Sequence, residues 1–285
     1  MWIVWLVLIL LILLLAYAWA IRPNLPRRDI SPLLGVDYAH RGLWNTNEPG
    51  EENRPADDLR PENSLAAFRA AVEKGYGIEL DVHRTRDGAL VVHHDDSLKR
   101  LTGQDIRIAR STLKEIRACQ LPNGEPIPTF DEVLKAVAGR VPLIVEIKVE
   151  DGNHALLARA VHERMKRYHG SWCLESFSPN AVKWFRMNAP EVIRGQLAFD
   201  HAGKGETAFL FWRNIGIASM LQNFFSRPDF VAFEARSVKW HTLSIRLLRL
   251  MKPWFVAWTV RSQEDMDKQR GQWDLQIFEK FEARQ

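Results

Sequence analysis

Residues 77–95 read GIELDVHRTRDGALVVHHD. The stretch holds two short apolar runs, 77–82 and 90–93, with an Asp87-Gly88 turn between them. Such a turn joins antiparallel neighbours, because a crossover between parallel strands needs about a dozen residues or more. We therefore predict that one run belongs to a larger sheet and that the other forms a local hairpin with it. The sequence leaves open which of the two is the hairpin strand.

On both sides of this stretch, short apolar runs alternate with helical patterns, which is typical of a mostly parallel sheet covered by helices. The 285 residues leave room for one large α/β domain or two small ones, and a (β/α)8 barrel takes roughly 250 residues. The nine candidate strands, one more than such a barrel holds, are 36–40, 77–82, 90–93, 142–147, 172–177, 193–198, 230–234, 255–260 and 275–278. The candidate helices are 62–75, 111–118, 129–137, 153–168 and 179–188.

The first 21 residues carry no charged side chain. A helix of this length spans about 30 Å, the thickness of the hydrocarbon core of a bilayer. Tryptophan and tyrosine flank the segment at both ends, as an interfacial belt requires. A cleaved signal peptide with an Ala-x-Ala site within residues 16–20 is the alternative, but a basic n-region is missing and the apolar stretch is too long. We expect a retained transmembrane anchor over residues 1–21.

Arg22, Arg27 and Arg28 follow this segment, and no basic side chain precedes it. The positive-inside rule then places the rest of the chain in the cytoplasm of a single-pass membrane protein. Pro23 and Pro26 end the helix and predict a short stiff linker over residues 22–34. The third unit, residues 35–285, is the folded domain.

Composition excludes several classes of protein. The chain is 46% hydrophobic and 26% charged, which excludes a disordered or fibrous protein. The net charge is only +4 and no Lys/Arg-rich run occurs, so we expect no nucleic-acid partner. Cys119 and Cys173 lack the spacing of a disulfide framework or a zinc knuckle, and we expect both to be buried and reduced. No feature implies a protein partner.

Charged side chains stand at the ends of several candidate strands. Glu79 and Asp81 are two residues apart on one strand and therefore face the same way, as do Glu146 and Lys148 on another. Converging carboxylates repel one another unless a divalent cation neutralises them, and oxygen ligands favour Mg²⁺, Ca²⁺ or Mn²⁺. A structural ion-pair cluster of Asp81, Glu146, Lys148 and Arg41 is the equally weighted alternative.

A set of short segments follows in a fixed order between residues 36 and 261. They are His40-Arg41-Gly42, PENSLAAF (61–68), GIELDV (77–82), RDG (86–88) leading to VHHD (92–95), IPTF (127–130), VEIK (145–148), Ser176-Phe177 and AWTV (257–260). In order and spacing they resemble the glycerophosphodiester phosphodiesterase family. The resemblance covers nearly all of the chain after the apolar segment.

The resemblance implies a TIM-type (β/α)8 barrel over residues 35–285 that hydrolyses glycerophosphodiesters to sn-glycerol 3-phosphate and an alcohol with one divalent cation. It implies that His40 and His94 are the acid–base pair and that Arg41 and Lys148 bind the phosphate. Among the remaining residues it implies that Glu79, Asp81 and Glu146 are the metal ligands, and that Glu62 and Asn63 support the metal or contact it. His93 should face away from the site, because adjacent strand residues point in opposite directions, and His83 has no assigned role.

Three further segments bear on the substrate. Residues 43–60 should form a loop over the active-site face, as a lid or as a solvated insertion. Residues 205–260 hold eleven aromatic residues that either pack in the core or form a surface for a bilayer or an acyl chain, and we expect Trp258 to line the substrate pocket. Residues 273–280 lack the Thr-Asp-x-Pro ending of many family members, and none of the proposed ligands comes from them.

Two other functions compete with the phosphodiesterase. A lysophospholipase D would keep the fold and the chemistry but act on lysophospholipids at the membrane. A membrane-tethered phosphoanion-binding protein would keep the pocket but catalyse nothing. The first is favoured by the apolar segment and the aromatic stretch, and the second is disfavoured because every residue that the chemistry needs is present.

Overall fold

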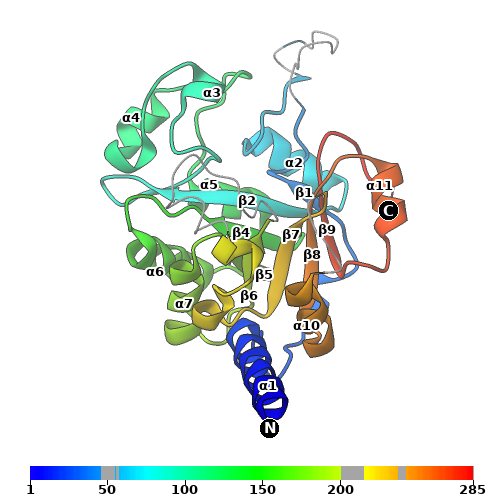
Figure 1. The fold of residues 1–285 in the computed structure, drawn as a ribbon. Helices are drawn as coiled ribbons and strands as arrows, with labels where there is room; N and C mark the ends of the chain where they lie inside the picture. Colours follow the sequence, from blue (N-terminus) through cyan, green and yellow to red (C-terminus); the bar gives the residue numbers. More distant parts are fainter. Residues whose placement is uncertain (46–54, 56–57, 200–214, 237–241, 285) are drawn as a thin grey trace.

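The computed structural model describes residues 1–45, 55, 58–199, 215–236 and 242–284. Eight parallel strands form a closed barrel, since β1 pairs with both β2 and β9 (Figure 1). The barrel strands are β1 (Tyr38–His40), β2 (Gly77–Arg84), β4 (Leu143–Ile147), β5 (Trp172–Ser176), β6 (Arg194–Ala198), β7 (Phe230–Glu234), β8 (Trp254–Val260) and β9 (Leu275–Phe278). The TIM-type barrel is confirmed.

The ninth strand, β3 (Leu90–Val92), is the hairpin partner that the Asp87-Gly88 turn predicted. It pairs antiparallel with the far end of β2, where Val82 lies opposite Val92. β2 keeps its place in the barrel by pairing with β1 and β4. β2 is therefore the barrel strand, because it has parallel partners on both sides, and β3 is the hairpin strand.

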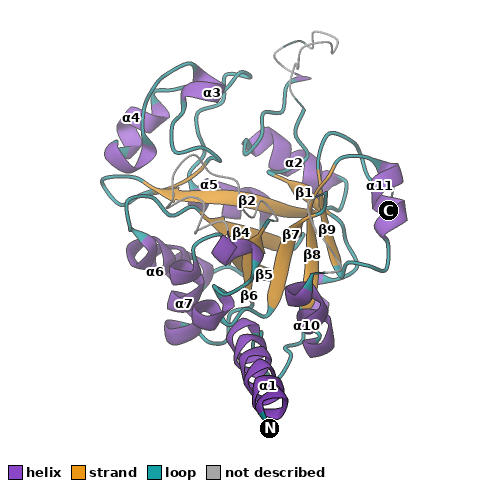
Figure 2. Ribbon diagram, in the orientation of Figure 1, coloured by secondary structure: helices purple, strands orange, loops and turns teal. Residues whose placement is uncertain are grey.

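Helices cover the outside of the barrel (Figure 2). Ser64, Thr129 and Ser178 cap three of them with their hydroxyl groups, which accept hydrogen bonds from the first helical turn. The helices between strands are α2 (Leu65–Glu73), α5 (Phe130–Val137), α6 (His154–Met165), α7 (Pro179–Asn188), α9 (Asn223–Ser226), α10 (Leu243–Met251) and α11 (Gln263–Gln269). The five predicted helices are all present, with ends shifted by a few residues.

Two layers of apolar side chains stabilise the barrel. The outer layer packs between strands and helices, and the inner layer fills the barrel with Tyr38, Ile144, Cys173 and Phe230 among others. Gly195 is needed there, because a Cβ at this position would lie 2.0 Å from the ring of Phe230. Cys119 and Cys173 are both free and buried, as expected.

The chain between β3 and α5 forms a small excursion beside the barrel, at the upper left of Figure 1. It contains α3 (Lys99–Thr102), η3 (Ile108–Arg110) and α4 (Leu113–Arg117). Its apolar side chains, including Leu98, Ile108 and Ile116, form a separate buried cluster against Val91 of β3. This excursion carries Arg100, which reaches the site described below.

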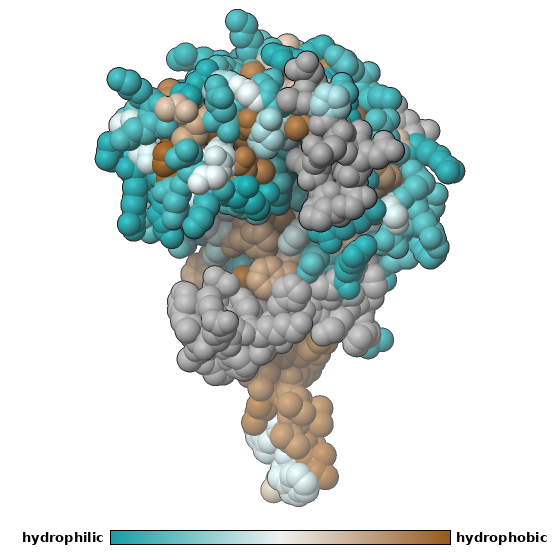
Figure 3. Space-filling view, turned by 90° about the horizontal axis from the view of Figure 1, so that it is seen from above, coloured by the Kyte–Doolittle hydropathy of each residue, from teal (hydrophilic) through white to brown (hydrophobic). Residues whose placement is uncertain are grey.

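The apolar N-terminal segment is one helix, α1 (Trp2–Ile21), which projects from the body of the protein (Figure 3). It is long and apolar enough to cross a membrane, as an anchor or a signal sequence would be. Its last turn packs on α9 and α10, and the side chains of Asn223 and Arg227 donate hydrogen bonds to its final carbonyl groups. The linker that follows contains η1 (Ser31–Leu33) and crosses the end of the barrel where the strands begin, with Arg28 paired to Asp229.

Candidate functional site

A polar pocket of about 280 Å³ opens where the barrel strands end, the face on which TIM barrels carry their active sites. Most of the residues predicted for the site line this pocket: His40, Arg41, Glu62, Glu79, His94, Glu146, Lys148 and Trp258. Asp81 and Asn63 are buried beside it, joined by a hydrogen bond of 2.8 Å from Asn63 Nδ2 to Asp81 Oδ2. The structure therefore brings all ten predicted residues together.

Glu79, Asp81 and Glu146 form a compact carboxylate cluster. One oxygen of each lies within 4.8 Å of an oxygen of the others, and all three side chains are buried. Strand register creates the cluster, since Asp81 on β2 stands directly opposite Glu146 on β4. Burial, together with the charges of Asp81 and Glu146, raises the pKa of Glu79 well above its ordinary value.

Glu175 adds a fourth buried carboxylate that the sequence analysis missed. It lies on β5 opposite Glu146 and lines the pocket. Burial and the charge of Glu146 raise its pKa well above the ordinary value, and its Oε2 atom has no hydrogen-bond partner among the described residues. A carboxylate one residue before the quoted Ser176-Phe177 pair was the available signal, because it occupies the same position near a strand end as Glu146.

Two cations lie among these carboxylates. Lys148 Nζ is 3.0 Å from Glu146 Oε1 and 3.2 Å from Asp81 Oδ1, and Arg41 Nε is 3.6 Å from Asp81 Oδ2. Burial opposes ionisation of Asp81, but Lys148 and Arg41 outweigh it and hold its pKa well below the ordinary value. The ion pairs that a structural cluster would need are thus present. The four carboxylates still outnumber the two cations, which leaves negative charge uncompensated.

The donor set fits a hard divalent cation. Every candidate ligand is a carboxylate oxygen, and one of them, Glu175 Oε2, is buried without a hydrogen-bond donor. Mg²⁺, Ca²⁺ and Mn²⁺ prefer such oxygen ligands, and a bound cation would relieve the repulsion that raises the pKa values of Glu79 and Glu175. Glu79, Asp81 and Glu146 are the residues placed to hold it, with Glu175 beside them.

His40 is oriented by a residue from the end of the chain. Its Nδ1 lies 2.6 Å from Glu279 Oε2, and Arg261 Nε donates to the other oxygen of Glu279 at 2.7 Å. Burial and nearby Arg41 lower the pKa of His40, so the imidazole is neutral at pH 7. A neutral ring that donates from Nδ1 to Glu279 carries its lone pair on Nε2. Glu279 lies in the segment 273–280, from which the sequence analysis took no ligand, and it reaches His40 because β9 ends beside β1.

His94 is oriented by a second network, built on the excursion. Its Nδ1 lies 2.7 Å from Asp95 Oδ1, and Arg100 Nε donates to Asp95 Oδ2 at 2.6 Å. Arg100 also forms two hydrogen bonds with Glu62, which in turn accepts one from Arg41 at 2.9 Å. Glu62 therefore joins the two sides of the pocket. His93 is buried away from the pocket, as predicted.

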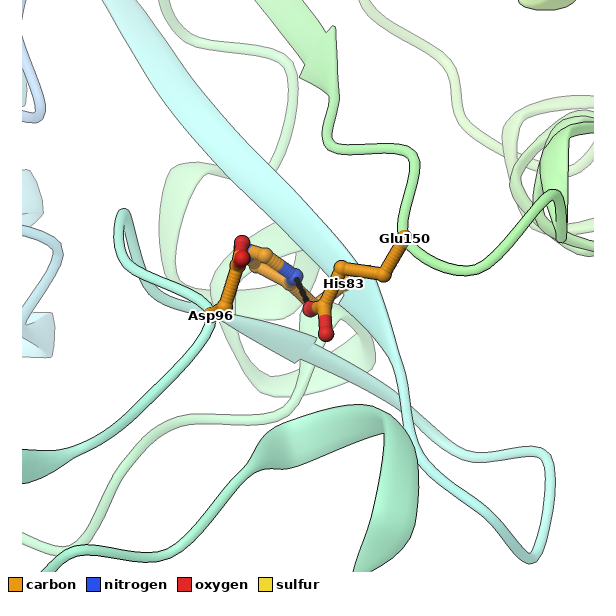
Figure 4. A group of neighbouring side chains, drawn as sticks. All are labelled: His83, Asp96 and Glu150. Atoms are coloured by element: carbon orange, nitrogen blue, oxygen red, sulfur yellow. Dashed lines mark hydrogen bonds and ion pairs between the residues drawn. The ribbon is translucent and has the colours of Figure 1, made fainter. Parts of the chain in front are cut away.

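His83, Asp96 and Glu150 form another group close enough to hold a metal ion (Figure 4). Both ring nitrogens of His83 already have partners, with Nδ1 2.6 Å from Glu150 Oε1 and Nε2 3.2 Å from the carbonyl oxygen of His94. A cation bound there would have to displace one of these two partners of the ring. His83 therefore steadies the backbone of the loop that carries His94.

The backbone at the start of the site is unusual. Arg41 and Asn63 have φ angles of 60° and 57°, in the left-handed region that non-glycine residues rarely occupy. Arg41 N–H donates to Glu79 Oε2 at 3.0 Å, and Asn63 N–H donates to the carbonyl of Arg41 at 2.9 Å. Gly42 allows this close approach, since a Cβ there would lie 2.9 Å from the backbone of Ala67.

Aromatic side chains form one wall of the pocket. Trp258 and Phe177 line it, with their ring centres 5.7 Å apart, and Trp44 lines it as well. The long loop predicted over residues 43–60 is described only at residues 43–45, 55 and 58–60; the rest lies outside the described residues. Of the predicted aromatic stretch, Phe209, Phe211, Trp212 and Trp240 also lie outside them. Phe230, Phe233 and Phe255 are core residues, whereas Phe224 and Phe225 are exposed.

Comparison with known proteins agrees with this geometry. The model of the glycerophosphoryl diester phosphodiesterase family matches residues 40–272. A glycerophosphodiester phosphodiesterase of Caldanaerobacter subterraneus is 40% identical over 151 residues, which cover 48% of this chain and 61% of the relative. A human lysophospholipase D, GDPD1, is 37% identical over 122 residues, covering 38% of each chain. The matched parts thus span less than two thirds of these relatives.

Solved structures share the fold. An Oleispira antarctica phosphodiesterase, solved in complex with its product sn-glycerol 3-phosphate, superposes with a TM-score of 0.67 at 21% identity, over 86% of this chain and 93% of its own. A glycerophosphodiester phosphodiesterase from Parabacteroides distasonis superposes with a TM-score of 0.64 at 25% identity, over 86% and 94%. The barrel is therefore a known architecture.

Proposed function

Because the chain belongs to the glycerophosphoryl diester phosphodiesterase family, we propose that it hydrolyses glycerophosphodiesters to sn-glycerol 3-phosphate and an alcohol. The proposal rests on one observation. A buried cluster of carboxylates and two separately oriented histidines share one pocket with Arg41 and Lys148. Hydrolysis of a phosphodiester requires positive charge at the phosphate and a proton donor and acceptor on its two sides, and this pocket supplies all of them.

The carboxylates are assigned to a resident divalent cation, Mg²⁺ or Ca²⁺, with Mn²⁺ as a third candidate. Glu79, Asp81 and Glu146 would hold it, and Glu175 is close enough to complete the set. When bound, a cation of this kind neutralises charge on the phosphate oxygens. Glu62 and Asn63 have a supporting role. Glu62 accepts hydrogen bonds from Arg41 and Arg100, and Asn63 donates one to Asp81.

The two histidines are assigned to proton transfer. His40 is neutral and fixed by Glu279, so its Nε2 accepts the proton of the attacking hydroxyl, from water or from the glycerol of the substrate. His94, held by Asp95, donates a proton to the leaving alcohol oxygen. Arg41 and Lys148 bind the phosphate, and Trp258 forms the wall against which the rest of the substrate lies.

We infer that α1 is a retained membrane anchor and that the barrel is cytoplasmic. Cleavage after Ala20 would remove the carbonyl groups of Trp19 and Ala20, which accept hydrogen bonds from Arg227, and the Tyr17 hydroxyl group, which donates to the carbonyl of Ser219. Buried polar groups without partners are costly, which supports retention. The cytoplasmic orientation rests on Arg22, Arg27 and Arg28 after the helix.

The test is release of glycerol 3-phosphate from glycerophosphocholine by the full chain in detergent. EDTA should abolish release, and Mg²⁺, Ca²⁺ or Mn²⁺ should restore it. His40→Gln or His94→Gln should lower kcat by about 10²- to 10⁴-fold, the usual contribution of acid–base groups. Glu79→Gln should raise the metal concentration needed for half-maximal activity roughly 10- to 100-fold. His154→Gln, at the start of α6, is the matched control and should change nothing.

Two outcomes would contradict these assignments. If a histidine variant keeps a tenth of the activity of the wild-type protein, that histidine is not an acid or base in the reaction. Phosphate-ester binding that is indifferent to both histidine variants, with no hydrolysis under any metal, would instead identify a non-catalytic binding protein. Whether the substrate carries an acyl chain, as for a lysophospholipase D, is taken up next.

A further inference from the structure

An apolar groove lies beside the polar pocket on the same face of the barrel. Its volume is about 750 Å³, within the range of roughly 300–1,000 Å³ that is usual for ligand clefts. Among the described residues its wall is almost wholly apolar, formed by Val149, Phe177, Phe199, Ile217, Leu221 and Phe225. Such a wall offers nothing to a charged head group and suits a hydrocarbon chain.

Phe177 joins the groove to the polar pocket. It lines both, and its ring centre lies 5.7 Å from that of Trp258 on the pocket side and 5.7 Å from that of Phe199 on the groove side. The three rings form a continuous row from one cavity to the other. A molecule with its phosphodiester beside the carboxylates can therefore extend a hydrocarbon tail along this row into the groove.

The direction of α1 shows which face of the barrel meets the membrane. Segment 215–229 runs toward the beginning of β7, and several hydrogen bonds join it to the end of α1 and the linker. Three of them run from Asn24 N–H to the Pro228 carbonyl, from Asn223 Nδ2 to the Ile21 carbonyl, and from Tyr17 Oη to the Ser219 carbonyl. In these three bonds earlier residues of α1 contact earlier residues of the segment, while the long side chain of Arg227 reaches back to the end of the helix. The exposed part of α1 therefore points away from the beginnings of the strands, toward the face that carries the pocket and the groove.

The surface between α1 and the groove is itself apolar. Leu221, Phe224 and Phe225 are 43%, 41% and 47% exposed, and the ring of Phe224 packs against Trp19 of α1 at 5.4 Å. A bilayer that surrounds α1 lies against these side chains, because they are continuous with the helix that crosses it.

We propose that the groove along α9 holds the acyl chain of a single-chain phospholipid that enters from the bilayer around α1, while its phosphodiester lies in the polar pocket. The inference rests on the proposed function and names its substrate class, a lysophospholipid. One groove beside one phosphate site gives room for one chain.

The experiment compares two substrates with the full chain reconstituted in phosphatidylcholine vesicles. One is lysophosphatidylcholine with acyl chains of increasing length, and the other is glycerophosphocholine, which has the same head group and no chain. For the wild-type protein, kcat/KM should rise with chain length, by up to about fourfold for each methylene group that becomes buried. Glycerophosphocholine should be the poorer substrate.

Groove variants separate chain binding from chemistry. Leu221→Asp and Phe225→Asp alter exposed side chains and should fold; each should lower kcat/KM for the longest lysophospholipid by roughly 10-fold or more, since a charge replaces an apolar contact. Turnover of glycerophosphocholine should stay within twofold. Leu250→Asp is the matched control, because Leu250 is 78% exposed in the last turn of α10, outside the groove, and should affect neither substrate.

The outcomes are distinguishable. Hydrolysis of glycerophosphocholine without any dependence on acyl-chain length, or equal loss of both activities in the groove variants, would overturn the acyl-chain site and leave the proposed function intact. Hydrolysis of neither substrate with any metal would overturn the proposed function and, with it, this inference. Equal turnover of lysophospholipid in detergent micelles and in vesicles would keep the acyl site but remove the bilayer as the route of entry.

Discussion

At the scale of single residues, Glu279 is the side chain that most changes the interpretation of the site. It is 7% exposed, binds His40 with one oxygen and Arg261 with the other, and stands on the last strand of the barrel. Burial alone would raise its pKa, but the hydrogen bonds from His40 and Arg261 and the charge of Arg261 outweigh burial, and the pKa is lowered to about 2. Glu279 therefore remains ionised and fixes the ring of His40.

We predict that Glu279→Leu lowers kcat roughly 10-fold or more with little change in KM, because His40 can then adopt the wrong tautomer or turn out of position. Glu279→Gln keeps the shape and an oxygen that can accept from Nδ1, and should retain more activity than the leucine variant. Steady-state kinetics on glycerophosphocholine measure both. Equal loss in both variants would indicate that the negative charge, rather than the hydrogen bond, is what matters.

The same residue predicts a dependence of stability on pH. The ordinary pKa of 4.5 applies to the unfolded chain and about 2 to the folded one, so the unfolded chain binds the proton first as the pH falls. The stabilisation is present above about pH 4.5 and is lost between pH 4.5 and 2, with an upper limit of roughly 3 kcal/mol. Thermal unfolding of the full chain in detergent should show a smaller acid loss for Glu279→Gln than for the wild-type protein.

At the scale of elements, α5 connects the excursion to the barrel. Thr129 caps this helix in a capping box with Glu132, and it also forms an isolated β-bridge with Val91 of β3. Glu132 accepts a further hydrogen bond from Arg117 of α4, at the opposite side of the excursion. One helix start therefore positions both β3 and α4, and through them the loop that presents His94.

We predict that Thr129→Ala lowers the free energy of unfolding by about 1 kcal/mol, within the range of 0.5–2 kcal/mol that is typical of lost N-caps. Thr129→Ser keeps the hydroxyl group and should cost much less. Chemical denaturation followed by circular dichroism measures the difference between them. If the two variants are equally destabilised, the β-branched methyl group rather than the cap is responsible.

At the scale of the whole molecule, the joint between α1 and the barrel sets the direction in which α1 leaves the protein. Arg227 Nη1 lies 2.8 Å from the carbonyl oxygen of Trp19 and 3.1 Å from those of Ala20 and Arg22. These are carbonyl groups at the end of a helix, which have no partners within the helix itself. The linker continues the attachment, with the Trp254 indole donating to the carbonyl of Arg28 at 2.9 Å.

We predict that Arg227→Met loosens this joint, because the loss of these hydrogen bonds costs roughly 1–3 kcal/mol. Limited trypsin digestion of the full chain in vesicles should then cut the linker after Arg27 or Arg28 about 5- to 150-fold faster, the same free energy expressed as a ratio. Arg236→Met, which removes a 61%-exposed side chain elsewhere, is the control. Unchanged cleavage would show that the remaining contacts, among them buried Ile21 and the hydrogen bond from Asn223, hold the helix without Arg227.

The sequence by itself determined the alternation of strands and helices, the apolar N-terminal segment, and the face shared by Glu79 and Asp81. These features are local, because they depend on spacing along one strand or helix. The ordered motifs also singled out His40 and His94, which line one pocket in the structure. A feature that lies within one short segment can be predicted from the order of residues in that segment.

Only the tertiary structure decided which side chains from distant segments meet. Glu175 joins the carboxylates because β5 pairs in register with β4, and Glu279 reaches His40 because closure of the barrel places β9 beside β1. The attachment of α1 required Arg227, some 200 residues away, and the groove required α9 to lie beside Phe177. Such contacts depend on closure of the sheet and on helix packing, which no spacing along the chain encodes.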